Sequence, residues 1–259
     1  MTSFFWLYNI PQDLQLEKDT VDIWCIPLDI DEASLVSFYQ ILSVEERSKA
    51  ERMRIEAPRK HYVAARAIMR QIIAAYMKEK PERLEFQYGP NEKPALARAF
   101  SRTGITFNMS HSHGLALYGV TLEREIGVDI EKIRQDMSIT DLAKRFFSNR
   151  EYEELINLPA EQKEQGFFNC WTRKEAYLKA TGEGLKFPLS QFDVSLAPGE
   201  PAALLEHRTD PEQASLWSIA ELDIGPGYAA ALSVEGKDFT ISYKYLPRNC
   251  TDEHGNFKT

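Results

Sequence analysis

Cysteine is scarce in this chain of 259 residues. The three cysteines, Cys25, Cys170 and Cys250, are far apart and odd in number, and no CxxC pair occurs. This spacing excludes a disulfide framework. We therefore interpret them as free thiols of a protein in a reducing compartment.

Long apolar runs are also absent. No stretch of about 18 apolar residues occurs, so no membrane-spanning helix is expected. The N-terminal segment MTSFFWLYNIPQDLQLEKD lacks the basic start and the long apolar core of a signal peptide. A cytoplasmic protein is the resulting expectation.

Basic residues are fewer than acidic residues. Lys and Arg number 31 against 39 Asp and Glu, which gives a formal net charge of -8 at pH 7. Nucleic acid is therefore a poor candidate for the main partner. The nucleophile motif GxSxG is missing as well, which argues against a serine hydrolase of that type.

The composition that remains is that of an ordinary globular protein. Hydrophobic residues make up 43% and charged residues 27% of the chain. The length fits one large domain or two of roughly 100–150 residues, enough to bury a full core.

Local patterns predict alternating groups of strands and helices. Capping boxes begin a helix after Ser43 and another after Ser148, and Gly182 and Gly184 end a third. The predicted helices are 44–54, 59–77, 151–157 and 165–181. The predicted strands are 21–30, 105–110, 115–122, 126–131, 192–196, 215–222, 228–234 and 239–245.

The two halves of the chain look alike. In each, strands precede a capped helix, which a long amphipathic helix follows. This repetition predicts an α+β fold of two similar lobes, 1–104 and 105–246, with a polar tail at 247–259. A site that uses both lobes would lie in the cleft between them.

Asp129 and Glu131 lie in the segment GVDIE (127–131). Alternate residues of a strand point to one face, so the two carboxylates project together while Val128 and Ile130 enter the core. Adjacent carboxylates repel unless a cation lies between them, and magnesium suits such ligands. From this segment alone, a solvent-exposed strand edge is the simpler explanation.

Trp171, Glu175 and Lys179 share one face of the 165–181 helix at four-residue spacing. An ordinary Glu–Lys pair on a solvated helix is again the simpler explanation. The tryptophan on the same face, however, indicates partial burial.

Small polar residues end the strand at 105–110. Asn108, Ser110 and His111 suit contacts with phosphate or ribose oxygens, although such residues are common in structural turns. Lys93 lies in a loop from which it could reach an anion, and Lys49 lies on the first capped helix.

Taken together and in this order, the motifs resemble those of the phosphopantetheinyl transferase superfamily, in its larger, two-lobed Sfp-like class. The resemblance is carried by FNMSHS (107–112), GVDIE (127–131), FFNCWTRKEAYLKATGEGL (167–185) and the upstream Lys93-Pro94. It implies two α+β lobes in a pseudo-twofold arrangement. It also implies an enzyme that transfers the 4'-phosphopantetheine arm of coenzyme A to a serine of an acyl or peptidyl carrier protein.

The resemblance assigns roles to particular residues. It implies catalytic roles for Asp129, Glu175 and Lys179, and a magnesium ion (or manganese) bound by Asp129, Glu175 and Glu131. Coenzyme A would be held by Lys49, Lys93, Asn108, Ser110, His111 and Lys179. Lys60, His61 and Arg66 are further neighbours to consider. Some family members carry another base one helical turn before Lys49, where this chain has Glu45 and Glu46.

The same resemblance places carrier docking along residues 145–190. A carrier is usually acidic, so docking requires a local basic patch that outweighs the net charge. The bases of this stretch are Arg145, Arg150, Lys163, Arg173, Lys174 and Lys186, with Phe147 and Leu185 as apolar contacts. Ordinary surface ion pairs are the alternative.

The two large aromatic residues of the 165–181 helix are not expected to take part in the chemistry. Trp171 and Tyr177 are expected to pack rather than to catalyse. Because both lobes lie in one chain, a monomer is expected. A magnesium-dependent coenzyme A hydrolase and a non-catalytic carrier-binding protein remain as alternatives.

Overall fold

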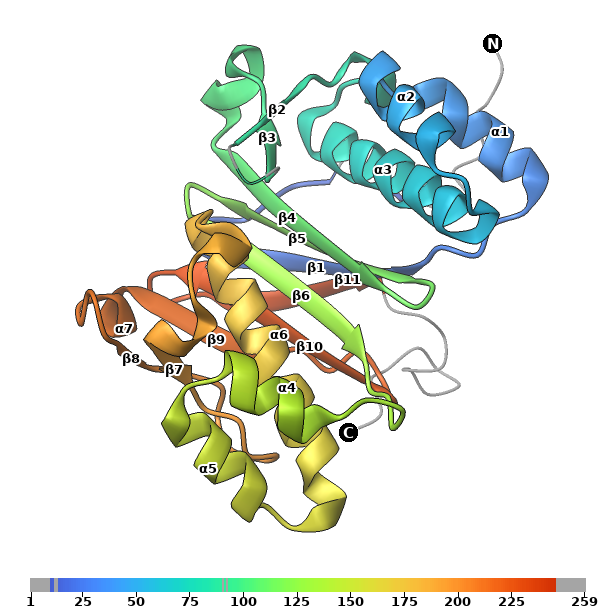
Figure 1. The fold of residues 1–259 in the computed structure, drawn as a ribbon. Helices are drawn as coiled ribbons and strands as arrows, with labels where there is room; N and C mark the ends of the chain where they lie inside the picture. The colour runs from blue at the N-terminus through green and yellow to red at the C-terminus, as the bar shows by residue number, and fades with distance from the viewer. Residues whose placement is uncertain (1–9, 12–13, 90, 92, 246–259) are drawn as a thin grey trace, which may run out of the picture.

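The computed structural model describes residues 10–11, 14–89, 91 and 93–245. The predicted polar tail and Cys250 lie outside the described residues. Two α+β halves lie one above the other, with the N-terminal helices in the upper half (Figure 1). Within the described ranges, no helix is both long and apolar enough to cross a lipid bilayer. Cys25 and Cys170 are buried free thiols.

The first half is built on a four-stranded sheet with the order β11-β1-β5-β4. Strand β1 pairs antiparallel with β5, which pairs antiparallel with β4, while β11 lies parallel to β1. These strands are β1 (Thr20–Pro27), β4 (Ile105–Ser112), β5 (Leu115–Leu122) and β11 (Thr240–Tyr245).

Three helices of the first half pack together and against this sheet: α1 (Glu32–Ile41), α2 (Val44–Arg52) and α3 (Glu56–Met77). The capping box of Ser43 and Glu46 begins α2, as predicted. The side chain of Asp31 caps α1, a helix that the periodicity did not predict. The apolar stripe of α3 joins the strands in the first core.

The second half repeats this plan around a three-stranded antiparallel sheet, β6-β10-β9. Its strands are β6 (Ile126–Lys132), β9 (Trp217–Glu221) and β10 (Tyr228–Glu235). Its helices are α4 (Ile139–Phe146), α5 (Asn149–Asn157) and α6 (Lys163–Thr181). Helix α4 was not predicted, whereas α5 begins at its predicted capping box.

A short hairpin sits at the same point of each half, between the long helix and the last strand pair. In the first half it is β2 (Phe86–Tyr88) with β3 (Pro94–Leu96), and in the second β7 (Phe192–Val194) with β8 (Leu204–His207). A short helix, α7 (Gln213–Leu216), follows the second hairpin. The shared order of a strand, three helices, a hairpin and two antiparallel strands confirms the predicted repeat of two α+β halves.

The strand pairing groups residues 105–122 with the first half, because β4 and β5 are hydrogen-bonded to the sheet of β1. The predicted division at residue 104 therefore cuts through a sheet. The change from one repeat to the next lies between Leu122 and Ile126. A division into separately folding domains stays a prediction.

The two sheets pack against each other and share a core of aliphatic residues. Val21, Ile23 and Leu117 of the first sheet lie in one cluster with Ile126 and Val128 of the second. A Cβ at Gly119 would lie 2.8 Å from the side chains of both Ile126 and Val128, so glycine permits this close approach. The contact between β5 and β6 brings motifs from the two halves together.

Candidate active site

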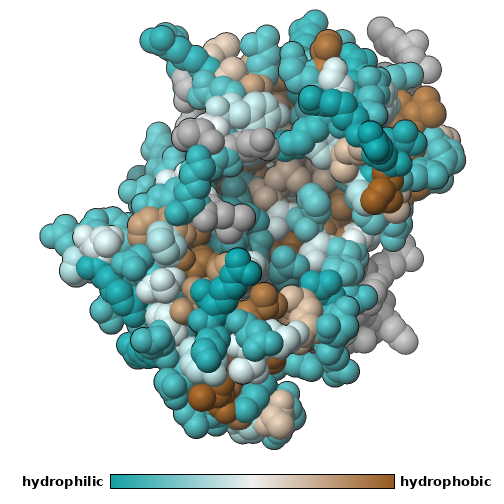
Figure 2. All heavy atoms as spheres, in the orientation of Figure 1, coloured by the Kyte–Doolittle hydropathy of each residue, from teal (hydrophilic) through white to brown (hydrophobic). Residues whose placement is uncertain are grey.

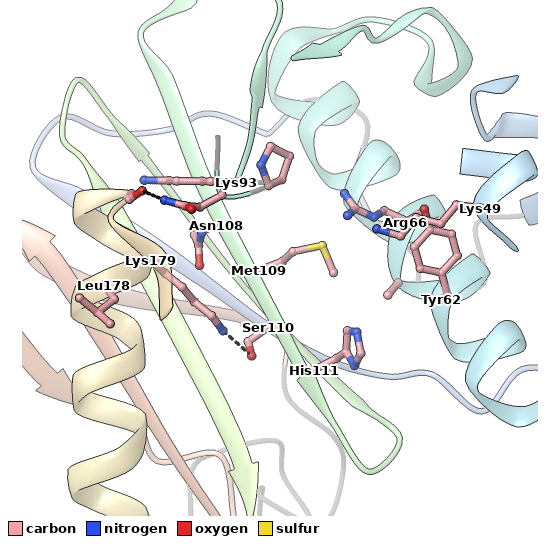
Figure 3. Close-up of a pocket in the computed structure, with 15 residues that line it drawn as sticks. Lys49, Tyr62, Arg66, Lys93, Asn108, Met109, Ser110, His111, Leu178 and Lys179 are labelled. Carbon is pink, nitrogen blue, oxygen red and sulfur yellow. Dashed lines mark hydrogen bonds between the residues drawn. The ribbon is translucent and has the colours of Figure 1, made fainter. Parts of the chain in front are cut away.

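A cleft of about 450 Å³ opens between the two halves. The surface is hollowed here and mostly hydrophilic around the hollow (Figure 2). One wall comes from α2 and α3, another from the end of α6, and β4 lies between them (Figure 3). Its polar lining residues include Lys49, Tyr62, Arg66, Asn91, Lys93, Asn108, Ser110, His111 and Lys179. All six residues predicted to hold coenzyme A thus line one cleft, and their roles stay predictions.

Asp129 of β6 is 3% exposed and lies beside β4 and α6. Its Oδ1 accepts hydrogen bonds from Ser110 Oγ at 2.7 Å and from Lys179 Nζ at 2.6 Å. Lys179 also donates to Ser110 Oγ at 2.9 Å (Figure 3). No described residue hydrogen-bonds to the other carboxylate oxygen, Oδ2, although it is buried. A buried acceptor without a donor is costly, so this oxygen is suited to a ligand.

Gly127 explains how helix α6 comes so close to Asp129. A Cβ at this position would lie 2.0 Å from the carbonyl oxygen of Ala176 and 2.4 Å from the backbone nitrogen of Ala180. Any larger residue would push α6 away from β6. Glycine therefore allows Glu175 and Lys179, on this helix, to lie close to Asp129.

Glu175 lies one helical turn before Lys179. Its Oε1 is buried, and the described part of the chain offers it no hydrogen-bond partner. The pKa of Glu175 is raised to about 7, mainly by burial and secondly by the negative charge of Asp129. The positive charge of Lys179 opposes this shift. A neutral carboxylic acid and a carboxylate are therefore both accessible to Glu175 near neutral pH.

Glu131 lies on the same face of β6 as Asp129, as predicted, with Val128 and Ile130 in the core. Its Oε2 accepts a hydrogen bond from Ser112 Oγ at 2.8 Å. Burial and then the charge of Asp129 raise the pKa of Glu131. The alternative of a solvent-exposed strand edge is excluded, because Asp129 is buried.

No group of three or more His, Cys, Asp or Glu side chains in the described ranges is already arranged as a metal site. Two donors nevertheless fit a divalent cation. Asp129 Oδ2 and Glu175 Oε1 are buried carboxylate oxygens that accept no hydrogen bond from any residue of the described ranges. Such hard oxygens are the ligands that magnesium prefers, and a cation would relieve the repulsion that raises the pKa of Glu175.

Across the cleft, α2 and α3 present a basic wall. Lys49 and Arg66 lie over the ring of Tyr62, at 6.0 and 5.7 Å from its centroid, and Arg66 also lies 5.8 Å from the centroid of Tyr88. Tyr62 was missed by sequence reasoning. Its four-residue spacing from Arg66 on a predicted helix is the signal that could have found it.

Lys60 and His61 point to other partners and do not line the cleft. Lys60 pairs with Glu32 and, at 2.8 Å, with Glu56. Nε2 of His61 lies 2.9 Å from Oδ1 of Asp29. The structure therefore places Arg66, but neither of these two residues, at the candidate nucleotide wall.

His111 lies at the mouth of the cleft, at the end of β4. Desolvation first, and then the positive charges of Lys179 and Arg66, lower the pKa of His111. The imidazole is therefore neutral at physiological pH and can donate one hydrogen bond.

Two of the bases expected at the docking surface are buried. Arg173 is 1% and Lys174 0% exposed. Arg173 bonds Glu221 and the Ser195 carbonyl, and Lys174 bonds Glu151, so neither can meet a carrier. This part of the docking prediction was wrong, because helix periodicity alone does not show which side of α6 faces the second core.

The apolar part of the docking prediction also needs correction. Phe147 is buried, and it stacks on Phe167 at 5.2 Å between ring centroids. The Leu185 side chain lies outside the described part of the chain. Arg145, Arg150 and Lys186 are exposed. Lys163 is half-buried and donates to the carbonyl of Ile156.

Trp171 and Tyr177 are packing residues, as predicted. Trp171 stacks on Phe167 with centroids 6.0 Å apart. Tyr177 packs against Phe192 and Trp217 in the second core.

Comparison with known families matches both halves of the chain. Residues 125–233 match the family described as the 4'-phosphopantetheinyl transferase superfamily. Residues 30–119 match the family described as 4'-phosphopantetheinyl transferase, N-terminal. The two matched segments are separated by residues 120–124, close to the place where the strand pairing passes from the first sheet to the second.

Curated relatives span nearly the whole chain. The 4'-phosphopantetheinyl transferase HetI of a Nostoc species is 41% identical over 236 residues, which cover 91% of this chain and 96% of that protein. The 4'-phosphopantetheinyl transferase ffp of Bacillus subtilis is 30% identical, over 93% of this chain and 99% of that protein. Among solved structures, the holo-[acyl-carrier-protein] synthase of Thermotoga maritima matches 44% of this chain and 63% of its own, with 18% identity and a TM-score of 0.34.

Proposed function

The chain belongs to the 4'-phosphopantetheinyl transferase superfamily, and from this premise we propose that it transfers the 4'-phosphopantetheine arm of coenzyme A to a serine of an apo acyl or peptidyl carrier protein. The products are the holo carrier and 3',5'-ADP. The observation that carries the proposal is a pair of buried oxygens, on Asp129 and Glu175, to which no described residue hydrogen-bonds. Asp129 is bonded to Ser110 and Lys179, and these two residues line the cleft that has a basic opposite wall.

The reaction requires little covalent chemistry from the protein. The serine oxygen forms a bond to the β-phosphorus of coenzyme A, and the bond from that phosphorus to the leaving 3',5'-ADP oxygen breaks. Such transfers depend on alignment and on neutralisation of phosphate charge. A cleft with lysines and an arginine on facing walls suits a diphosphate.

Asp129 and Glu175 would hold a magnesium ion, with Glu131 as a further carboxylate on the same strand face. When bound, magnesium would neutralise the diphosphate and lower its repulsion of the incoming oxygen. Lys179, already bonded to Asp129 and Ser110, stands beside these acids and would neutralise charge on a phosphate oxygen as the bond breaks.

Glu175 is the best candidate for the group that accepts the serine proton. In the metal-free protein its pKa of about 7 lies near physiological pH, where a general base is most effective. A carboxylate that ligates a cation is a poor base. In that case a water molecule beside it would take the proton first.

The opposite wall would bind the nucleotide. Lys49 and Arg66 supply positive charge on this wall, and Lys93 adds a further positive charge from the α6 side of the cleft. Neutral His111 and Ser110 supply hydrogen-bonding groups. This local concentration of bases offsets the net charge of -8 for an anionic co-substrate.

Both walls of the cleft come from one chain, which supports a monomer as the active form. The buried free thiols Cys25 and Cys170 suit a reducing compartment such as the cytoplasm.

The test is mass spectrometry of an apo carrier protein incubated with the enzyme, coenzyme A and magnesium. We expect the carrier to gain one phosphopantetheine arm while 3',5'-ADP is released. Release of 3',5'-ADP without a mass gain would identify a coenzyme A hydrolase instead. Carrier binding with no modification at any magnesium concentration would identify a non-catalytic binding protein.

A further inference from the structure

Asn91 and Lys93 of the first half contact the C-terminal end of α6. Nδ2 of Asn91 donates to the carbonyl oxygens of Gly182 at 2.8 Å and of Glu183 at 2.7 Å. Nζ of Lys93 donates to the carbonyl oxygen of Ala180 at 2.9 Å. Two side chains of the first half thus bind three carbonyls at the end of the second half's catalytic helix.

The carbonyls of Ala180 and Gly182 are groups that a helix end leaves without intrahelical partners, and the carbonyl of Glu183 belongs to the turn that follows. The helix dipole also favours a positive charge at this end, and Lys93 supplies that charge. Figure 3 shows the Lys93 side chain directed toward the end of α6, across the cleft from Lys49 and Arg66. Lys93 also pairs with Glu125 at 2.8 Å, so its ammonium group joins the helix end to the residue that precedes β6.

The helix end is shaped to fit Asn91. Gly184 has a φ of 64°, in the left-handed region that favours glycine. A Cβ at Gly184 would lie 2.7 Å from Cγ and 2.8 Å from Cβ of Asn91. Glycine is therefore required at 184 both by the backbone and by the seated Asn91 side chain.

The clamped turn is itself part of the cleft, because Gly182, Gly184 and Asn91 line it. Gly182 lies seven residues beyond Glu175, which is about 10 Å along the axis of an α-helix. The clamp therefore shapes a wall that is remote from the carboxylates.

We propose that Asn91 is a positioning residue for coenzyme A, an inference that rests on the proposed function. It holds the Gly182–Gly184 turn of the second half against the first, and so sets the width of the cleft where the co-substrate binds. It acts on binding of coenzyme A and not on the transfer step at Asp129 and Glu175.

The test compares Asn91→Ala and Asn91→Asp with the parent enzyme. Aspartate keeps the volume that fits Gly184 but places an acceptor against two carbonyls. We expect both variants to raise KM for coenzyme A about five- to tenfold, with kcat within about threefold of the parent. Amide hydrogen exchange at residues 182–186 should also become faster in both.

Asn157→Ala is the matched control. Asn157 donates to the Glu153 carbonyl at 2.8 Å at the end of α5, so the variant loses the same kind of bond. It should leave KM and the exchange at 182–186 unchanged.

Asn91 variants with parental KM and exchange would overturn the inference, and so would a loss of thermal stability and kcat at constant KM. If the parent enzyme modifies a carrier, only the clamp is refuted by these results. If the parent neither binds coenzyme A nor modifies a carrier, the proposed function fails, and the clamp's role fails with it.

Discussion

Asp22 on β1 and Asp129 on β6 occupy equivalent places in the two halves. Each lies between a valine and an isoleucine on the first strand of its repeat, and each is almost fully buried. Asp22 accepts a hydrogen bond from Tyr76 of α3 at 2.6 Å, whereas Asp129 accepts one from Lys179 of α6. Nζ of Lys244 on β11 also lies 3.3 Å from Oδ1 of Asp22. The long helix that packs on the buried carboxylate thus presents an aromatic hydroxyl in one half and an ammonium group in the other.

A second pair of equivalent contacts shows which positions of α3 and α6 correspond to each other. The capping-box Glu46 bonds Arg70 of α3, and the capping-box Glu151 bonds Lys174 of α6. Glu175, which follows Lys174, therefore corresponds to Gln71, which follows Arg70.

The comparison shows how one scaffold carries two roles. In the first half, Tyr76 also accepts a hydrogen bond from Trp24, and this aromatic pair closes the space over Asp22. In the second half, Glu175 and Lys179 replace a neutral amide and an alanine, and a cleft opens beside them. Few side chains at equivalent positions therefore distinguish a structural half from a catalytic one.

The largest difference between the halves should appear in activity. Asp129→Asn and Glu175→Gln should each lower carrier modification by about a thousandfold, because each removes a charge that the cation and phosphate require. Asp22→Asn, the matched change in the first half, should leave activity within about threefold where the protein folds. Mass spectrometry of the carrier measures this, with circular dichroism as the check on folding. A large loss of specific activity in folded Asp22→Asn would break the comparison.

The matched buried ion pairs should be equally important for stability. Arg70→Met and Lys174→Met each leave a buried glutamate without its partner, so each should lower the free energy of unfolding by about 3–5 kcal/mol. Urea unfolding followed by tryptophan fluorescence measures the loss. A loss below about 1 kcal/mol in only one half would show that the pairs are not equivalent.

The pKa of Glu175 predicts a pH-dependent cost that Gln71, at the equivalent position of the first half, cannot have. The carboxyl's pKa is about 7 in the folded protein, against an ordinary value of 4.5, so between these pH values the folded state binds more protons than the unfolded state. The free energy of unfolding should therefore fall as pH rises from 4.5 to 7.

Glu175→Gln should remove this cost and stabilise the metal-free protein by about 2 kcal/mol at pH 8, with little effect at pH 4.5. Thermal unfolding in EDTA at the two pH values measures it. Added magnesium should stabilise the parent at pH 8 but should have much less effect on Glu175→Gln. Equal stabilisation of both proteins by magnesium would contradict a metal-ligating role for Glu175.

The smallest effect concerns Tyr76. Tyr76→Phe removes the hydrogen bond to Asp22 and should lower the free energy of unfolding by about 1–2 kcal/mol. Carrier modification should stay at the parental rate, because the proposed mechanism gives Asp22 no part in catalysis. A slower rate without a change in stability would assign Asp22 a part in catalysis.

Sequence patterns predicted the structural features that depend on residues only a few positions apart. The capping boxes at Ser43 and Ser148 begin helices as predicted, since each closes within one turn. The alternation in β6 placed Asp129 and Glu131 on one face. The order of motifs, read as a family resemblance, identified Asp129, Glu175 and Lys179 of the second half, which lie close together at the edge of the cleft that Lys179 lines.

Burial could not be predicted in the same way. Arg173 and Lys174 look like surface bases in the sequence, yet both are buried with acidic partners brought from β9 and α5. A basic side chain is stable in a core only where the fold supplies such a partner. The partner lies 48 residues away from Arg173 and 23 away from Lys174.

The sequence by itself thus determined the capped helices, the longest helices, the long strands, the repeat and the strand face on which Asp129 and Glu131 lie, because short-range sterics and hydrogen bonds govern these. Only the tertiary structure decided which groups meet. It brought α6 against β6 at Gly127, left Asp129 and Glu175 with unused oxygens, and placed Asn91 on the end of α6. These contacts depend on the packing of two sheets against each other, to which the whole chain contributes.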